Sequence, residues 1–201
     1  MAFSITPDLS FCLIDGNPIF LDIEADRYFT LPSDRTDALL AEQSLGATIE
    51  ELPIQSSTCS ILELPTLESS GGLPAFLEVA AITLSVRLQL KRKRLRLVLD
   101  ELPSRASQGN FGATDAVDEE GSLLRACTIF RRARPHVPIP TRCLLDSISL
   151  IHFLARRGFH SDLVFGVTTD PFTAHSWVQR GNMVLNDTLG NTRTYTPIKV
   201  I

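Results

Sequence analysis

A cysteine, a histidine and an aspartate in the C-terminal third of the chain could together form a nucleophilic site. Cys143 follows Thr141, a good helix N-cap, and falls at the second position of the predicted helix. The unpaired N–H groups and positive dipole end of a helix N-terminus favour a thiolate and lower the pKa of a thiol. Cys143 is therefore the candidate nucleophile, although a capping turn can also bury an inert cysteine.

The base and its orienting acid are expected on a β-hairpin, residues 171–187, with the sequence PFTAHSWVQRGNMVLND. Gly181 and Asn182 both tolerate positive φ and predict the turn. If the loop has three residues, 180–182, His175 and Asp187 lie directly opposite each other, with Cβ atoms about 4.5–5.5 Å apart. Asp187 could then orient the imidazole, whose other nitrogen could accept a proton from a thiol. A two-residue loop shifts the register by one and separates the two side chains, unless a bulge intervenes.

Each of these residues also has a purely structural interpretation. His175 could be a half-buried strand residue satisfied by a neighbour, and Asp187 could simply open the turn after Asn186. The other cysteines, Cys12, Cys59 and Cys127, are scattered, with no CxxC pair and no metal-ligand spacing. We expect free thiols and no metal site.

The elements that must position the site follow an α+β pattern. Apolar residues recur at helical spacing after Thr141, and Gly158 ends that helix. Strand-like segments follow at 163–169, in the hairpin and at 193–200. Papain-like and transglutaminase-like folds use the same Cys, His, Asp order, with the nucleophile on a helix packed against the sheet that carries the other two.

The N-terminal part predicts a second, smaller unit. Short strands at 11–15, 19–23 and 27–31 read as an antiparallel meander. Helical segments are expected at 33–44, 48–52 and 56–64, which gives a winged-helix-like module of three strands and three helices. Residues 68–72 read as a linker, so the predicted domains are 1–70 and 71–201. The second comprises a helical part (73–102), a loop (103–117) and a catalytic core (118–201).

Composition limits the classes of partner. The 201 residues are 44% hydrophobic and carry a net charge of -4, so no electrostatic argument favours nucleic acid. The basic run at 91–94 is flanked by leucines and reads as the solvated face of a helix. No signal peptide and no apolar run of roughly 18 residues is evident, so we expect a soluble cytoplasmic protein without a membrane partner.

Three segments of the sequence resemble a known family. The segments RCLLDSISLIHFLARRG and LVFGVTTDPFTAHSWVQRGNMVLND resemble the C-terminal half of lasso-peptide maturation B proteins, which are transglutaminase-like cysteine peptidases. The segment FLDIEADRYFTL is similar to their leader-recognition element, a PqqD-like winged-helix module. The resemblance implies that Cys143 is the nucleophile, His175 the base and Asp187 its orienter.

The resemblance also implies a function and partners. A member of this family would remove the leader from a ribosomally made precursor, after which an asparagine-synthetase-like cyclase closes the macrolactam. The chain shows no nucleotide motif and no cofactor site, so any need for ATP is assigned to the complex with the cyclase. Two alternatives stay open: a binding scaffold that has lost peptidase activity, and a transglutaminase-like acyl transferase that uses an amine in place of water.

The leader is expected to bind as an added strand along the edge of the N-terminal sheet at residues 27–31. The residues predicted to contact it are Arg27, Tyr28, Phe29, Thr30 and Leu31, with Ile61 and Leu62 from the third short helix. Tyr28, Ile61 and Leu62 would form pocket walls, and their alternative role is in the core.

Overall fold

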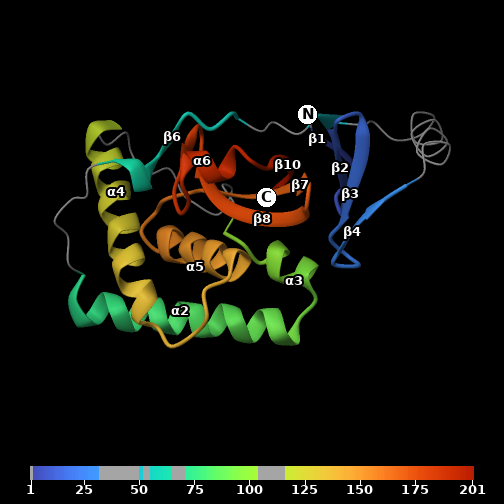
Figure 1. The fold of residues 1–201 in the computed structure, drawn as a ribbon. Helices are drawn as coiled ribbons and strands as arrows, with labels where there is room; N and C mark the ends of the chain where they lie inside the picture. The colour runs from blue at the N-terminus through green and yellow to red at the C-terminus, as the bar shows by residue number, and fades with distance from the viewer. Residues whose placement is uncertain (1, 32–49, 52–54, 65–70, 104–115) are drawn as a thin grey trace.

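The computed structural model describes residues 2–31, 50–51, 55–64, 71–103 and 116–201. These residues form two β-sheets of five strands each, with helices packed against the second sheet (Figure 1). The predicted α+β class is confirmed in this mixed arrangement of helices and two sheets.

The first sheet is antiparallel, with the strand order β4-β3-β2-β1-β5. Its strands are β1 (Ala2–Thr6), β2 (Leu9–Ile14), β3 (Asn17–Asp22), β4 (Arg27–Thr30) and β5 (Glu50–Glu51). The β2–β3 turn places Asp15 and Gly16 at φ of 50° and 78°, which suits the Asp-Gly pair found in tight hairpins. The three predicted strands are confirmed as β2, β3 and β4, while β1 and β5 were not foreseen.

The second sheet has the order β10-β7-β8-β9-β6. Its strands are β10 (Thr196–Val200), β7 (Asp162–Thr169), β8 (Phe172–Arg180), β9 (Met183–Val184) and β6 (Cys59–Ser60). All neighbours are antiparallel except β6, which runs parallel to β9. The strands predicted at 163–169, in the hairpin and at 193–200 are therefore confirmed.

The described residues also form five helices and two 3-10 turns. They are α2 (Gly72–Arg92), α3 (Leu95–Asp100), α4 (Ala116–Ala133), α5 (Cys143–Ala155) and α6 (Leu189–Thr192), with 3-10 turns η1 (Ile61–Glu63) and η3 (Arg134–His136). Figure 1 shows α5 between α2 and the second sheet. Burial from both sides explains why α5 carries apolar or small residues around most of its circumference, including Ile148, Phe153 and Leu154, which are fully buried.

The first sheet lies beside the β10 edge of the second. The Lys199 ammonium donates a hydrogen bond to the Pro7 carbonyl at 2.8 Å. Arg96 pairs with Asp8 at 2.8 Å, and Arg94 with Glu24 at 2.7 Å. Because β6 forms the opposite edge of the second sheet, the chain crosses from one edge to the other between β4 and β6.

Several local predictions for the N-terminal part are wrong or lie outside the described residues. Residues 56–64 are not a helix: β6 pairs with β9, and only the short turn η1 follows. Residues 50–51, expected to be helical, form β5. The predicted helix at 33–44 and most of the loop at 103–117 lie outside the described residues. The boundary at residue 70 stays a prediction, but β6, which precedes it, belongs to the second sheet.

The helix α2 is, among the described residues, the one whose length and apolar composition would suffice to cross a membrane. One face of α2 packs on α5, where Val79, Ile82 and Val86 are buried, whereas Leu73, Leu77, Leu84 and Leu88 on the same helix are exposed. Its Glu78 accepts hydrogen bonds from Arg157 at 2.6 and 3.2 Å.

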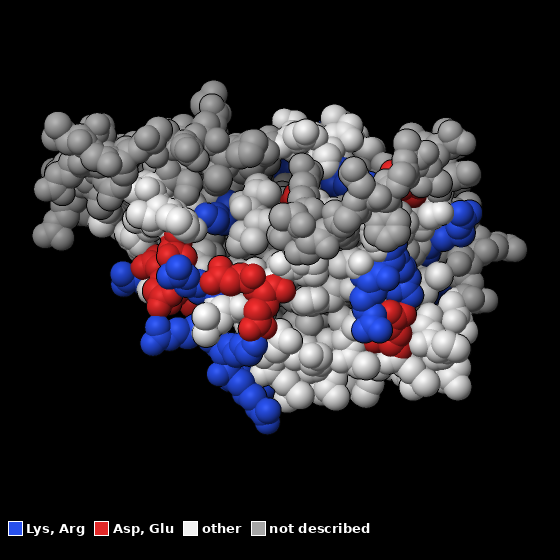
Figure 2. Space-filling view, turned by 180° about the vertical axis from the view of Figure 1, so that it is seen from behind, with Lys and Arg blue, Asp and Glu red and all other residues white. Residues whose placement is uncertain are grey.

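Surface charges of opposite sign lie close together. On the face shown in Figure 2, basic and acidic side chains adjoin, and the described residues form no continuous basic surface there.

A close approach of two aromatic side chains requires Gly166 on β7. A Cβ at this position would lie 2.7 Å from the Trp177 ring and 2.9 Å from the Tyr195 Cβ. Gly166 pairs directly with His175, whose ring centroid is 5.0 Å from that of Tyr195 and 6.1 Å from that of Trp177. The absent side chain thus allows both rings to pack beside the histidine.

We predict that Gly166→Ala lowers the free energy of unfolding by about 1–3 kcal/mol, because the added methyl overpacks a closed site. Gly121→Ala is the matched control, since its Cβ would meet only the end of Arg125 at 3.9 Å. Denaturant unfolding of both variants measures the difference. Equal midpoints for the two would contradict the packing assigned to Gly166.

Candidate active site

Cys143 is the first residue of α5 and is solvent-exposed. The N-cap is Arg142, with φ of -144°, so the predicted cap at Thr141 is wrong by one residue. The first bond within the helix runs from the Asp146 N–H to the Arg142 carbonyl at 2.9 Å. The N–H groups of residues 143–145 therefore precede the helical ladder and face outward at its N-terminus. The predicted placement of Cys143 at a helix start is confirmed.

A buried arginine, which the sequence analysis did not single out, organises the segment before Cys143. Arg134 is only 5% exposed, and its Nε donates to Asp146 Oδ1 at 2.7 Å. Its two remaining nitrogens donate to the carbonyls of Ile139 and Pro140 at 3.0 and 3.3 Å. One guanidinium thus ties the proline-rich loop to the first turn of α5. A guanidinium offers five donors in a fixed fork, which suits it to this task.

The structure brings His175 and Asp187 together. His175 Nε2 and Asp187 Oδ2 are 2.5 Å apart, and both side chains are more than four-fifths buried. Because Nε2 is engaged by Asp187, Nδ1 is the imidazole nitrogen available to Cys143. His175 and Cys143 are joined by a side-chain hydrogen bond. The three residues that the sequence singled out therefore form one connected group.

The hairpin register that predicted this contact is nevertheless wrong. The loop has two residues, because Arg180 pairs with Met183 and Gln179 with Val184. An intact ladder would then put His175 and Asp187 on opposite faces. The backbone pairing instead ends after Val184 with one bond from the Leu185 N–H to the Val178 carbonyl at 2.9 Å, and the Asn186 side chain accepts the Val178 N–H at 2.7 Å. The chain leaves the sheet there, which frees Asp187 to turn towards His175.

The turn that follows β9 holds the Asp187 carboxylate. The Asn191 side-chain amide donates to Oδ2 at 2.8 Å, and the Thr188 N–H donates to Oδ1 at 2.7 Å. Thr188 in turn caps α6 by accepting the Asn191 N–H at 3.2 Å. Both carboxylate oxygens are thus engaged, and the carboxylate has a fixed orientation.

The segment comprising β6 and η1 holds the same turn from the other side. The buried Ser60 hydroxyl donates to the Asp187 carbonyl at 2.5 Å. Glu63 accepts the Leu189 N–H at 2.9 Å, at the start of α6. These contacts are not predictable from the sequence pattern, which favours placing residues 56–64 in the N-terminal module.

The electrostatics favour a charged cysteine–histidine pair. The hydrogen bond from His175 lowers the pKa of Cys143 to about 7, with burial opposing the shift and donors on Ser176 adding to it. Hydrogen bonds to Asp187 and Cys143 raise the pKa of His175 to about 9. Burial would raise the pKa of Asp187, but its hydrogen bonds outweigh burial and lower it. Between pH of about 7 and about 9, thiolate, imidazolium and carboxylate therefore coexist.

The residues predicted to bind a leader fall into two separate places. β4 is an edge of the first sheet, where Arg27 and Thr30 are exposed and Tyr28, Phe29 and Leu31 are half-buried. Ile61 is buried in the main core, and Leu62 is half-buried beside it in η1. Since η1 follows β6 at the far edge of the second sheet, the structure does not join these two groups into one pocket (Figure 1).

Tyr28 lies closer to the triad than the sequence suggested. Its ring meets that of Phe172, the first residue of β8, at 5.8 Å between centroids. Burial, followed by the charge of the Cys143 thiolate, raises the pKa of Tyr28. The edge strand β4 therefore contacts the first residue of β8, the strand that carries His175.

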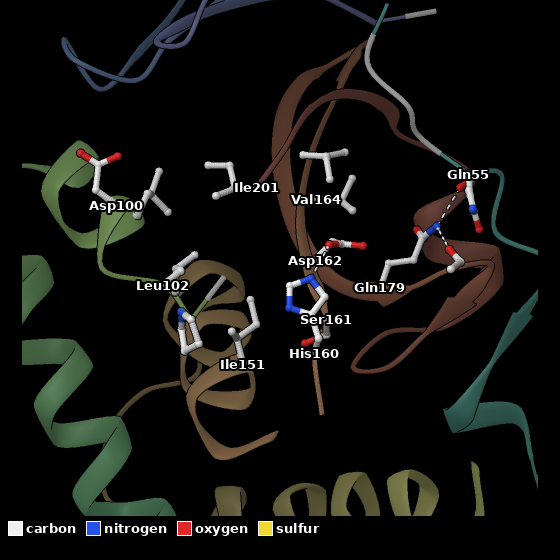
Figure 3. Close-up of a pocket in the computed structure, with 14 residues that line it drawn as sticks. Gln55, Asp100, Leu102, Ile151, His160, Ser161, Asp162, Val164, Gln179 and Ile201 are labelled. Atoms are coloured by element: carbon white, nitrogen blue, oxygen red, sulfur yellow. Dashed lines mark hydrogen bonds and ion pairs between the residues drawn. The ribbon is translucent and has the colours of Figure 1, made fainter. Parts of the chain in front are cut away.

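A cavity lies at the other end of the second sheet. It has a volume of about 600 Å³, and Figure 3 shows His160, Ser161, Asp162 and Gln179 in its wall. No triad residue lines it among the described residues. The described residues also contain no group of three or more His, Cys, Asp or Glu side chains suited to a metal ion.

Comparison with known proteins identifies the family to which this part of the chain belongs. The family model described as the transglutaminase-like superfamily matches residues 80–200. The chain belongs to the transglutaminase-like superfamily. The match covers every residue of the triad but excludes the first sheet, whose PqqD-like character stays a prediction.

A curated relative of the chain is the microcin J25-processing protein McjB of Escherichia coli. The two are 47% identical over 45 residues, which is 22% of this chain and 22% of McjB. The chain thus matches about a fifth of the length of that relative. No solved structure matches the chain.

We predict that iodoacetamide at pH 7 modifies Cys143 far faster than Cys12 or Cys127, because alkylation requires a thiolate. Burial raises the pKa of Cys12 to about 11 and that of Cys127 to about 12. His175→Ala should slow modification of Cys143, since losing the hydrogen bond returns the thiol pKa towards 9. Peptide mapping by mass spectrometry at several pH values gives the rates. An unchanged Cys143 profile in His175→Ala would contradict the ion pair.

Proposed function

We propose that this protein is a cysteine peptidase of lasso-peptide biosynthesis that cleaves a precursor between leader and core. The observation that carries the proposal is the Cys143–His175–Asp187 group at the N-terminus of α5. Membership of the transglutaminase-like superfamily and the similarity to a microcin-processing protein support it. The protein is proposed to act in the cytoplasm, with the precursor and an asparagine-synthetase-like cyclase as partners.

In the proposed mechanism, the Cys143 thiolate attacks the carbonyl carbon of the peptide bond at the leader–core junction. The resulting oxyanion accepts hydrogen bonds from N–H groups in the first turn of α5. Imidazolium His175 then donates its proton to the departing nitrogen, and the core leaves with a free α-amine. Water, deprotonated by His175, hydrolyses the thioester and releases the leader.

Asp187 has an orienting role in this scheme. Its carboxylate fixes the imidazole so that Nε2 faces the acid and Nδ1 faces sulfur, and it stabilises the imidazolium. The chain itself needs no metal or nucleotide for these steps. Any dependence on ATP is assigned to the complex with the cyclase.

We predict that Cys143→Ala abolishes cleavage of the precursor and leaves its binding intact, because the variant loses only the attacking sulfur. Mass spectrometry of the precursor after incubation, with and without cyclase, measures cleavage. Binding of fluorescent leader peptide to the same variant is the control. Near-wild-type cleavage by Cys143→Ala would end the proposal.

The same experiment separates the alternative activities. A wild-type protein that binds leader but yields no cleaved mass, even with cyclase, is a scaffold. A product mass that corresponds to the leader joined to an added amine identifies an acyl transferase. A leader carrying a free carboxylate identifies the hydrolase proposed here.

The edge strand β4 is the proposed docking site for the leader. An extended peptide that adds to β4 gains backbone hydrogen bonds from an edge that no described strand covers. Tyr28 on this strand contacts Phe172, three residues before His175 on β8. A leader bound along β4 therefore passes close to the nucleophile, and its C-terminal end can enter the site.

We predict that leader peptide slows amide hydrogen exchange in β4 of the full-length Cys143→Ala variant, because strand addition gives edge N–H groups new acceptors. Exchange in β5, the other edge of the first sheet, serves as the internal control. Protection of β5 with no change in β4 would contradict this docking site.

A further inference from the structure

A buried hydroxyl next to the triad lacks a normal hydrogen bond. Ser176 follows His175 on β8 and is 3% exposed. Its Oγ makes no hydrogen bond of ordinary geometry with any described residue. Burying a hydroxyl without a partner is unfavourable, so such a group calls for a physical explanation.

The backbone of Ser176 is fixed against the nucleophile helix. The Ser147 hydroxyl donates to the Ser176 carbonyl at 3.2 Å. Ser147 is four residues after Cys143 and so lies on the same face of α5, one turn along. The Asn186 amide donates to the Ser147 hydroxyl at 2.9 Å and completes this network. The network seats Ser176 beside the first turn of α5.

This placement brings Ser176 next to Cys143, the first residue of α5. Both the Ser176 hydroxyl and its backbone N–H lie close enough to lower the pKa of the thiol. The backbone donor is present whatever side chain stands here, whereas the hydroxyl is specific to Ser or Thr. No other role is evident for the hydroxyl among the described residues.

We propose that the Ser176 hydroxyl is a catalytic hydrogen-bond donor that stabilises the Cys143 thiolate before attack. The inference deepens the proposed function and rests on it, because it assigns Ser176 a role at the same nucleophile. The proton stays on the Ser176 oxygen throughout, and the sulfur electron pair forms the bond to the substrate carbon. The hydroxyl therefore adds to the stabilisation from His175 without competing for its proton.

The test is Ser176→Ala in the full-length protein, with two readouts. The pH midpoint of Cys143 alkylation should rise, and kcat for precursor cleavage should fall about tenfold, as expected for one lost hydrogen bond to a charged group. KM should not change, because the hydroxyl contacts the nucleophile and not the bound precursor. The variant should unfold at the same or a higher temperature than wild type, since it loses a poorly satisfied buried hydroxyl.

The chain supplies a matched control in Ser161. Its Oγ is also buried and without a partner among the described residues, but it lies in the wall of the distant cavity in Figure 3. Ser161→Ala should keep wild-type alkylation and kcat. Ser176→Thr, which retains a hydroxyl, should recover much of the low alkylation midpoint.

The outcomes separate this inference from the proposed function. Wild-type alkylation and kcat in Ser176→Ala would overturn the role of the hydroxyl, even with Cys143→Ala inactive. Equal losses in Ser176→Ala and Ser161→Ala would also overturn it, because both would then reflect the fold. If wild type cleaves no precursor, the proposed function fails, and the alkylation midpoint still tests Ser176.

Discussion

The hydrogen bond between His175 and Asp187 is the contact on which the candidate site depends. It fixes which imidazole nitrogen faces Cys143 and keeps the ring protonated when the thiol ionises. Neighbouring residues hold either the His175 ring or the Asp187 carboxylate in place. Gly166 lets two aromatic rings flank the histidine, while Asn191 and the β6–η1 segment hold the aspartate turn.

The sequence predicted the members of the site better than the geometry that joins them. A cysteine at a helix start and a histidine on a strand are local features, readable from an N-cap pattern and a turn signal. The contact between His175 and Asp187 was predicted from a three-residue loop, whereas the loop has two residues. The sheet ends early because Asn186 satisfies a strand N–H through its side chain, which no periodicity reveals.

The parts that sequence reasoning missed are long-range contacts. Arg134 reads as one more cation at a helix end, yet it is buried and ties the proline loop to α5. Strand β6 has two residues and no alternating pattern, so only its pairing with β9 defines it. By contrast, β2, β3, β4 and α5 follow from their own composition. The stretch predicted as helical over 73–102 is divided, because α2 ends at Arg92 and α3 begins at Leu95.

The course of β6 has a consequence for how such a protein can be divided. A polypeptide that starts at residue 71 would contain the whole triad, yet its second sheet would lack an edge strand. The Asp187 carbonyl and the Leu189 N–H would each lose their partner. A division of the chain into two polypeptides that keeps these contacts must therefore fall before residue 55. Only then do β6 and η1 stay in the same polypeptide as Cys143, His175 and Asp187. The segment that connects the two sheets is thus itself part of the structure that holds the turn at Asp187.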